Sequence, residues 1–171
     1  MKLLAPIAGL LMAFAIATAH SADDTAWIED QNGCKIANPH PQPKETVTWS
    51  GACVDGLASG EGSMQWFEGG RPTARYEGAL EAGWANGKGS LNLPNGAKYV
   101  GDWQNSREHG QGRMEWPDGS WYDGDWRSGK PHGYGQYRTA EGRLLTGKFV
   151  DGEWEPNANE KEVLPDDQHR T

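Results

Sequence analysis

Apolar and small residues alternate with polar ones over the middle of the chain, which is typical of strands whose two faces meet different surroundings. In YVGDWQ, residues 99–104, the tyrosine, glycine and tryptophan fall on one face and the other three residues on the other. Turn sequences such as PDGS (117–120) separate the alternating stretches, because proline fixes φ and glycine accepts a positive φ. The pattern predicts an antiparallel meander of β-hairpins.

The alternating pattern recurs with a period of 23 residues. Copies begin at Tyr76, Tyr99 and Tyr122, a half-copy begins at Leu145, and an earlier copy of 27 residues begins at Trp49. The extra four residues of that first copy are assigned to a loop, FEGGRPTAR, residues 67–75. Such self-similarity indicates a repeat architecture, in which a hairpin that is marginal alone becomes stable in the stack.

Glycines share the predicted strand face with the aromatic residues. A tyrosine or tryptophan ring can therefore lie across the bare backbone of a neighbouring strand, which recovers apolar contact at an otherwise weakening glycine. The Gly-x-Gly pairs recur in every full copy and lead into strands, whereas a phosphate-binding loop leads into a helix. We interpret the glycines as space for rings and not as a nucleotide site.

The copy YDGDWRSGKPHGYG, residues 122–135, resembles the MORN repeat (membrane occupation and recognition nexus), whose unit reads YxGxWxxGxxHGxGxxxxxDG. The resemblance covers residues 49–154 and departs from the pattern at Cys53, which occupies the tryptophan position of its unit. It implies an all-β fold, an elongated single antiparallel sheet of stacked hairpins. It also implies a scaffold or interaction module, in some members tied to membranes or to self-association.

The two ends of the chain differ from the repeat domain at 49–154. Residues 1–19 (MKLLAPIAGLLMAFAIATA) have the charged start, apolar run and small-residue ending of a secretory signal peptide, with cleavage after Ala19 or, as a second choice, Ala22. A permanent anchor is the alternative, although the apolar run is short for a membrane span. We therefore expect a periplasmic or secreted protein without a transmembrane segment after cleavage. Residues 155–171 form an acidic tail, expected to be flexible or, alternatively, to cap the array, with a short helical stretch around 159–164.

The chain has two cysteines, Cys34 and Cys53, and both follow the signal sequence. An oxidising compartment favours a disulfide between them. The bridge would hold residues 20–48 against the first hairpin, and we expect this segment to cap an otherwise open sheet edge.

Charge and side-chain chemistry exclude several functions. The formal net charge of −8 disfavours nucleic acid and anionic membrane surfaces as partners. His109 and His132 take the same slot in successive copies, about 10 Å apart, too far to share a metal, and a structural turn role is expected. No serine, cysteine or carboxylate pair stands in a setting of its own, so we expect no enzymatic activity, no catalytic or metal site and no cofactor.

The aromatic residues form the candidate binding surface, and a non-enzymatic protein-interaction scaffold of the cell envelope or secreted space is the predicted function. The partner would be another protein or a second copy; the alternative is a lipid or cell-envelope glycan bound along the aromatic face. Two alternatives stay open for the rings themselves: packing on glycine alone, or an exposed ribbon. Trp121 is expected on the opposite face. The candidate residues are Trp84, Trp103, Trp116, Trp121, Tyr122 and Trp126.

Overall fold

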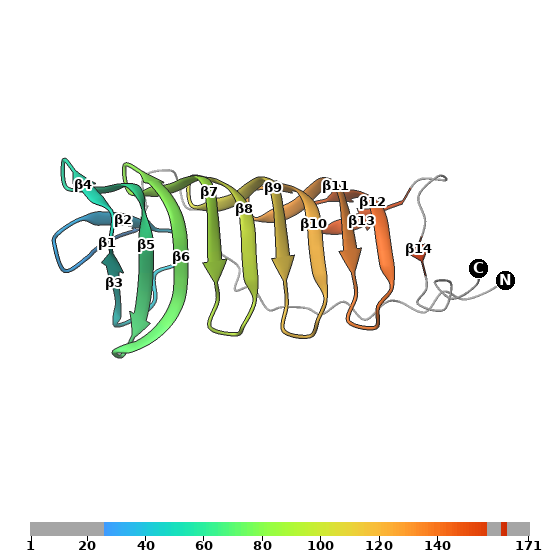
Figure 1. Ribbon diagram of the computed structural model, residues 1–171, viewed down its shortest axis with the longest axis horizontal. Helices are drawn as coiled ribbons and strands as arrows, with labels where there is room; N and C mark the ends of the chain where they lie inside the picture. The colour runs from blue at the N-terminus through green and yellow to red at the C-terminus, as the bar shows by residue number, and fades with distance from the viewer. Residues whose placement is uncertain (1–25, 157–161, 164–171) are drawn as a thin grey trace.

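The computed structural model describes residues 26–156 and 162–163, and over these residues the protein is built of strands. The strands stand side by side along the long axis of an elongated array, with the N-terminal strands at one end and the C-terminal strands at the other (Figure 1). Their bounds are β1 Ala26–Glu29, β2 Lys35–Asn38, β3 Glu45–Trp49, β4 Ala52–Val54, β5 Leu57–Glu68, β6 Arg71–Glu81, β7 Trp84–Asn92, β8 Lys98–Gln104, β9 Arg107–Glu115, β10 Trp121–Arg127, β11 Lys130–Arg138, β12 Leu144–Val150, β13 Glu153–Glu155 and β14 Glu162–Val163.

A single open sheet contains all of these strands, in the order β1-β2-β5-β6-β7-β8-β9-β10-β11-β12-β13, with β3 and β4 beside β5 and β14 beside β12. The pairings are antiparallel except for one parallel bridge between Lys35 of β2 and Leu57 of β5. The predicted meander of hairpins is confirmed, and the sheet is mixed only at that bridge. No helix long and apolar enough to cross a membrane occurs in the described part of the chain.

Two kinds of turn alternate along the meander. One end of the sheet has two-residue turns in which both central residues have positive φ, for example Ser128 (φ 50°) and Gly129 (φ 84°). Such turns match the right-handed twist of the flanking strands. The other end has three-residue turns that close with a glycine of positive φ, and in one of them Trp116 N–H donates to Ser120 O at 3.0 Å. This alternation sets the register of each hairpin and of the next.

The two-residue turns also connect successive units. From Gly83 onward, the second residue of each turn at this end donates its N–H to a carbonyl of the preceding unit: Gly83 to Ala58 at 2.8 Å, and Gly129 to Glu108 at 2.9 Å. Ser106 N–H donates in the same way, to Ala85 at 2.9 Å. Every unit therefore closes onto the one before it, in addition to the ladder bonds between their strands.

The first full hairpin is longer than the others. The four residues that the sequence assigned to a loop instead lengthen β5 and β6, which remain paired to Glu68 and Arg71 at the tip. Gly69 and Gly70, both with positive φ, make a two-residue turn there. The loop expectation was wrong because two adjacent glycines permit a tight turn, and the residues around them can then complete the ladder.

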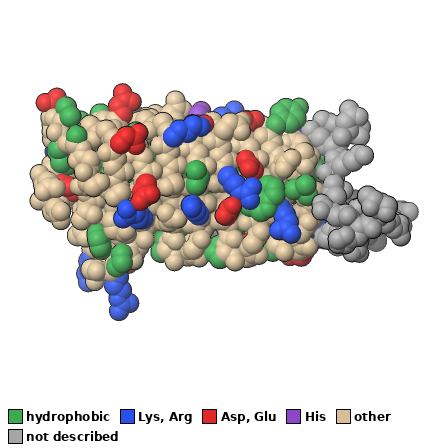
Figure 2. Space-filling model, in the orientation of Figure 1, with side chains coloured by type: hydrophobic (Ala, Val, Ile, Leu, Met, Phe, Trp, Pro, Cys, Tyr) green, Lys and Arg blue, Asp and Glu red, His purple; other side chains and the backbone are tan. Residues whose placement is uncertain are grey.

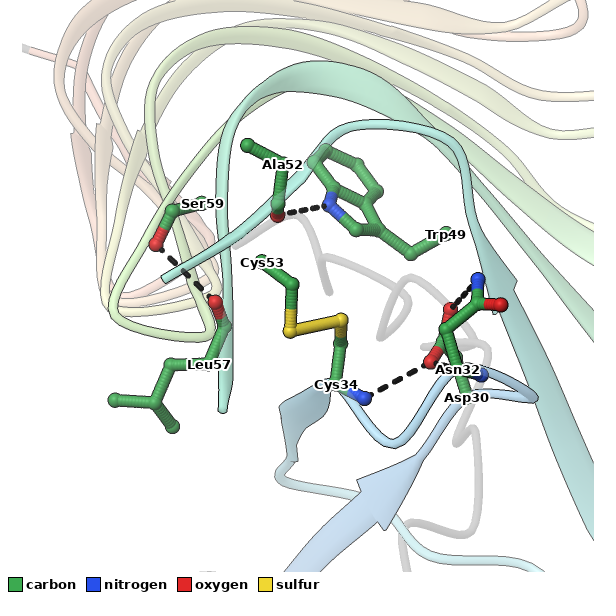
Figure 3. The surroundings of a disulfide bond; sticks show 8 residues. All are labelled: Asp30, Asn32, Cys34, Trp49, Ala52, Cys53, Leu57 and Ser59. Carbon is green, nitrogen blue, oxygen red and sulfur yellow. Dashed lines mark hydrogen bonds between the residues drawn. A yellow bond between two sulfur atoms is a disulfide. The ribbon is translucent and has the colours of Figure 1, made fainter. Parts of the chain in front are cut away.

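The N-terminal segment is pinned as predicted by a disulfide between Cys34 and Cys53, whose Cα atoms are 5.7 Å apart (Figure 3). Its hairpin, β1–β2, reaches the sheet at the turns: Lys35 N–H donates to Gly56 O and Ala37 N–H to Gly83 O, both at 2.9 Å. The hairpin β1–β2 therefore meets the sheet at its turn ends, while residues 45–48 of the predicted capping segment pair along β5 as part of β3.

At the C-terminal end, β12 and β13 extend the array by the predicted half-unit. Phe149 of β12 is buried against the preceding unit, and Trp154 pairs with it in register. Glu162 and Val163 form a strand with β12, in the stretch where a helix was expected. The rest of the predicted tail, 157–161 and 164–171, lies outside the described residues, as does the predicted signal sequence at 1–19.

Candidate interaction surface

A row of glycines crosses the sheet at one level. From β5 to β12 each strand contributes one glycine, and neighbouring members are direct partners in register. The missing β-carbons leave the inner face of the backbone open at this level, so that other groups can approach it closely there. The row consists of Gly62, Gly78, Gly89, Gly101, Gly112, Gly124, Gly135 and Gly147.

Tyrosine rings lie on these glycines on the inner face of the sheet. A β-carbon added at Gly89 would stand 2.6 Å from the hydroxyl oxygen of Tyr76. That hydroxyl donates a hydrogen bond to Ala79 O at 3.0 Å, and Tyr99 and Tyr122 each donate to the carbonyl three residues ahead at 2.9 Å. Ring and glycine therefore form one repeated unit of structure, which confirms that the glycines make room for rings.

The inner face is filled by a ladder of edge-to-face aromatic contacts. Consecutive ring centroids are 5.0–5.3 Å apart and the ring planes are 79–88° to one another. This geometry places the positive edge of one ring on the negative face of the next and stabilises each pair by about 0.5–1.5 kcal/mol beyond burial. The ladder runs through Tyr76, Trp103, Tyr99, Trp126, Tyr122 and Phe149.

Three of the residues predicted for the binding surface belong to this ladder. Trp103, Tyr122 and Trp126 have exposed fractions of 8%, 1% and 5%. The indole of Trp126 donates to Gly112 O at 2.8 Å, while that of Trp103 has no hydrogen-bond partner. These rings are core residues, so the structure places them inside the fold and not on an exposed ribbon.

Trp84 and Trp116 are half-buried, and each meets one other ring. The Trp84 ring lies edge-on to Trp27 of β1, with centroids 5.9 Å apart, so this non-repeated tryptophan anchors the N-terminal hairpin. Trp116 meets Tyr137 of the next hairpin at 6.1 Å. Both residues remain candidates for contact with a partner, and the presence of Trp84 is also explained by its contact with Trp27.

Trp121 lies on the outer face, as predicted. The guanidinium carbon of Arg113 is 4.3 Å from the centre of its ring, a cation–π contact at a partly exposed site. The six predicted residues therefore do not share one surface. Trp103, Tyr122 and Trp126 line the inner face, and Trp84 lies at the turn ends. Trp116 packs against Tyr137 of the next hairpin. Trp121 belongs to the outer surface, which the alternating pattern alone did not single out.

That outer surface holds an open groove of about 750 Å³ along the glycine row. Its floor is the bare backbone of β5 to β9, and Val100, 50% exposed, projects from it. Acidic and basic side chains stand along its sides, including Glu77, Lys88 and Asp123. Figure 2 shows one face of the array, on which basic and acidic side chains are scattered over a surface of polar side chains and backbone.

The charged side chains of the groove are linked in pairs. Lys88 Nζ is 2.6 Å from Asp102, and this hydrogen bond is the largest cause of the lowered pKa of the Asp102 carboxyl. Arg113 contacts Glu115 at 2.8 Å and Asp123 at 3.3 Å; the bond to Glu115 contributes most to its raised pKa. Exposed pairs of this kind add little stability, but they present fixed positions of both signs to a partner.

The inner side has a second hollow, between the N-terminal segment and the first hairpins. It has a volume of about 370 Å³ and is predominantly apolar, with Met64, Trp66, Leu91 and Leu93 among its walls. The covering segment is 37–45, which runs from the end of β2 to the start of β3. We refer to this hollow as the cap pocket. Sequence reasoning missed it, because it depends on how a non-repeated segment lies over the repeats.

Burial raises the pKa of three core tyrosines. Burial raises the pKa of Tyr76 to about 12, with a smaller contribution from Glu61, and burial likewise raises the pKa of Tyr99 and Tyr122. These phenols stay neutral and serve as hydrogen-bond donors in the core. Within the described residues no three histidine, cysteine or carboxylate side chains gather as metal ligands would.

His132 has the structural role predicted from its slot. Its Nδ1 accepts a hydrogen bond from Asp151 N–H at 3.3 Å, in the turn of the next unit. Asn86 occupies the same slot and accepts from Asn105 N–H at 3.1 Å. In these two units the slot therefore provides an acceptor for a turn amide.

The fold and this surface define a β-hairpin repeat protein with a ring-on-glycine core and an open outer groove. Comparison of the sequence with family profiles identifies the MORN repeat at residues 51–71, 76–98, 99–121 and 122–142. The chain belongs to the MORN repeat family, whose repeats are generally non-enzymatic modules for binding proteins or lipids. A comparison with curated proteins gave no match.

Proposed function

We propose that the protein is an exported interaction scaffold of the cell envelope or secreted space, without enzymatic activity, and that it binds a protein partner through the outer groove. The observation that carries this proposal is the form of that groove, an open channel of about 750 Å³ with a floor of glycine backbone. A segment of a partner can lie along this floor, between outward-pointing side chains such as Glu77, Lys88 and Val100.

The distribution of polar groups supports a protein as the partner. Basic and acidic side chains stand along the groove and are paired, as in Lys88–Asp102. They favour a partner with complementary charges of both signs. Val100 and Trp121 add exposed apolar contact beside them. A lipid or glycan along the aromatic face is less favoured, because Trp103, Tyr122 and Trp126 are buried. Self-association through the same groove is the other form of this proposal.

Export is supported by the N-terminal sequence and by the disulfide. Residues 1–19 have the pattern of a signal peptide, and the Cys34–Cys53 bond is of the kind that persists in oxidising compartments. A fusion of residues 1–25 to a reporter enzyme that is active only outside the cytoplasm tests this part. Absence of reporter activity in a producing cell would contradict export.

A crosslinking experiment tests the groove. A photoreactive amino acid at Val100, which lies in the groove, should capture one protein reproducibly and in stoichiometric amount from envelope extract, or a second copy of the chain. The same group at Asn95, in the turn that precedes β8, is the matched control. Arg113→Ala together with Asp123→Ala should weaken capture at Val100. Equal capture at both positions, or none at either, would overturn the proposal.

A further inference from the structure

The cap pocket has two features that together indicate the kind of molecule it fits. Its interior is apolar and partly aromatic, and its mouth carries two carboxylates that lie on the same face of neighbouring strands. We propose that the pocket binds a small organic cation, an amine whose apolar body fills the interior and whose charge lies at the mouth. This goes beyond the proposed scaffold function, because the site, the ligand and the face of the sheet are all different.

The carboxylates belong to Glu45 of β3 and Glu68 of β5, which are direct cross-strand partners and both line the pocket. Partners in register point to the same face, with β-carbons about 5 Å apart, and like charges placed this way repel one another. A cation between the two would replace that repulsion by two attractions. The pair is therefore a local arrangement that lowers stability without a ligand and favours a positively charged one.

The existing contacts leave this pair available. Glu45 accepts hydrogen bonds from Asn38 Nδ2 at 2.8 Å and from Gln42 N–H at 3.1 Å, both through Oε2, which fix its position without neutralising it. Arg71 faces Glu68 across the tip of the hairpin, but in the described part of the chain the two make no ion pair and Arg71 does not line the pocket. The lining of the pocket therefore includes two carboxylates and one basic side chain, that of His40.

The walls suit the apolar part of such a cation. Trp66 is half-buried beside Met64, and Tyr76 and Trp103 form the floor. Aromatic faces attract organic cations as well as apolar groups, so the same rings favour both ends of an amine with a hydrocarbon body. Pro39 and Pro94 close the sides.

The size and covering of the pocket favour a small molecule over a protein. A volume of about 370 Å³ is at the lower end of small-molecule sites. Segment 37–45 forms one side and the sheet the other, so the space lies between two parts of this chain. A folded partner would have to displace the segment, which is held by the Cys34–Cys53 disulfide nearby and by the Ala37 bond to Gly83 O.

Three probes with one hydrocarbon body separate charge from apolar contact: phenylbutylamine, phenylbutanol and phenylbutyrate. Titration calorimetry on the purified protein should give a dissociation constant for the amine about tenfold lower than for the alcohol, and the carboxylate should bind weakest. Affinity for the amine should fall at high salt while that for the alcohol changes little. Equal affinity for all three, or no binding of the amine, overturns the proposal.

Substitutions in the chain locate the site. Glu68→Gln should weaken amine binding about threefold and leave alcohol binding unchanged, whereas Glu77→Gln on the outer face is the matched control and should change neither. Ala74→Trp, which fills the pocket, should abolish binding of both. Unfolding temperatures of the variants confirm that the fold is intact. The proposal fails if Glu68→Gln behaves like Glu77→Gln, or if phenylbutylamine binds Ala74→Trp as it binds the parent. These measurements use only the purified protein and the probes, so their outcomes do not depend on whether crosslinking at Val100 captures a partner.

Discussion

The hydroxyl of Tyr76 lies on the bare backbone of Gly89, where an added β-carbon would stand 2.6 Å from its oxygen. The same relation between a ring and a glycine pair is repeated through the array, so these positions, and not a second layer of structure, form the core. Rings and glycines must therefore be considered together when the stability of the protein is tested.

Substitution of Gly89 tests this directly. Gly89 has no positive φ, so Gly89→Ala introduces a purely steric clash with the Tyr76 ring. We expect a loss of about 2–3 kcal/mol in the free energy of unfolding, measured in urea. Gly87→Ala is the matched control, since that site has open space and φ of +81°, and should cost only about 1 kcal/mol of backbone strain. A smaller loss at Gly89 than at Gly87 would contradict the ring-on-glycine core.

The buried phenols predict sensitivity to alkali. Burial raises the pKa of Tyr76 from 10.0 to about 12, so the native state favours the neutral phenol. The corresponding stability is fully present below pH 10 and is lost as the pH rises from 10 to about 12. Unfolding free energies measured across this interval should fall steadily. Tyr76→Phe should reduce the slope, whereas Tyr134→Phe, at an exposed ring, should leave it unchanged.

The disulfide should contribute to stability through the unfolded chain. Cys34 and Cys53 are 19 residues apart in sequence, for which loop closure predicts about 3 kcal/mol. We expect the Cys34→Ser, Cys53→Ser double variant to lose about this amount in urea unfolding. Reduction of the parent protein should produce a similar loss and leave the double variant unaffected. A double variant as stable as the parent would show that the bridge does not hold the N-terminal hairpin.

The hydrogen bond that His132 accepts predicts which substitutions this position tolerates. His132→Asn should be nearly neutral, because Asn86 in the equivalent slot already accepts a turn amide through its side chain. His132→Ala should cost about 1 kcal/mol, since Asp151 N–H loses its acceptor. A chelator should not change the unfolding temperature of any of these proteins. If both substitutions were equally costly, the imidazole would have a role other than as an acceptor.

The repeats could be predicted from the sequence because their determinants are local. Alternation around Tyr99 sets the strand faces, and turn residues such as Gly96 and Gly119 set the hairpin ends. Rings and glycines recur with the same period and on the same strand face, so each ring is placed over a glycine. What the alternation does not contain is how strongly the opposing rings bury one another. For this reason the sequence left both packing on glycine and an exposed ribbon open for Trp103 and Trp126, and the structure buries them in the core.

The non-repeated parts depend on contacts between segments far apart in the chain. The role of Trp84 requires Trp27, 57 positions earlier, and no periodicity relates the two. Likewise the cap pocket exists because segment 37–45 lies over strands β5 to β8. The cysteine pair predicted that this segment is pinned, but the bond alone does not fix which face or which turns it covers.

The turn amides that reach back to the preceding unit, as Gly83 does to Ala58 and Gly129 to Glu108, give the array a direction. Each unit completes its predecessor and offers the same acceptor to its successor. Insertion or deletion of one whole 23-residue unit between Tyr99 and Tyr122 would therefore conserve every type of contact, whereas a change of a few residues within a unit would break the series. The length of such an array can therefore change in steps of one hairpin, and its ends alone need unique sequence.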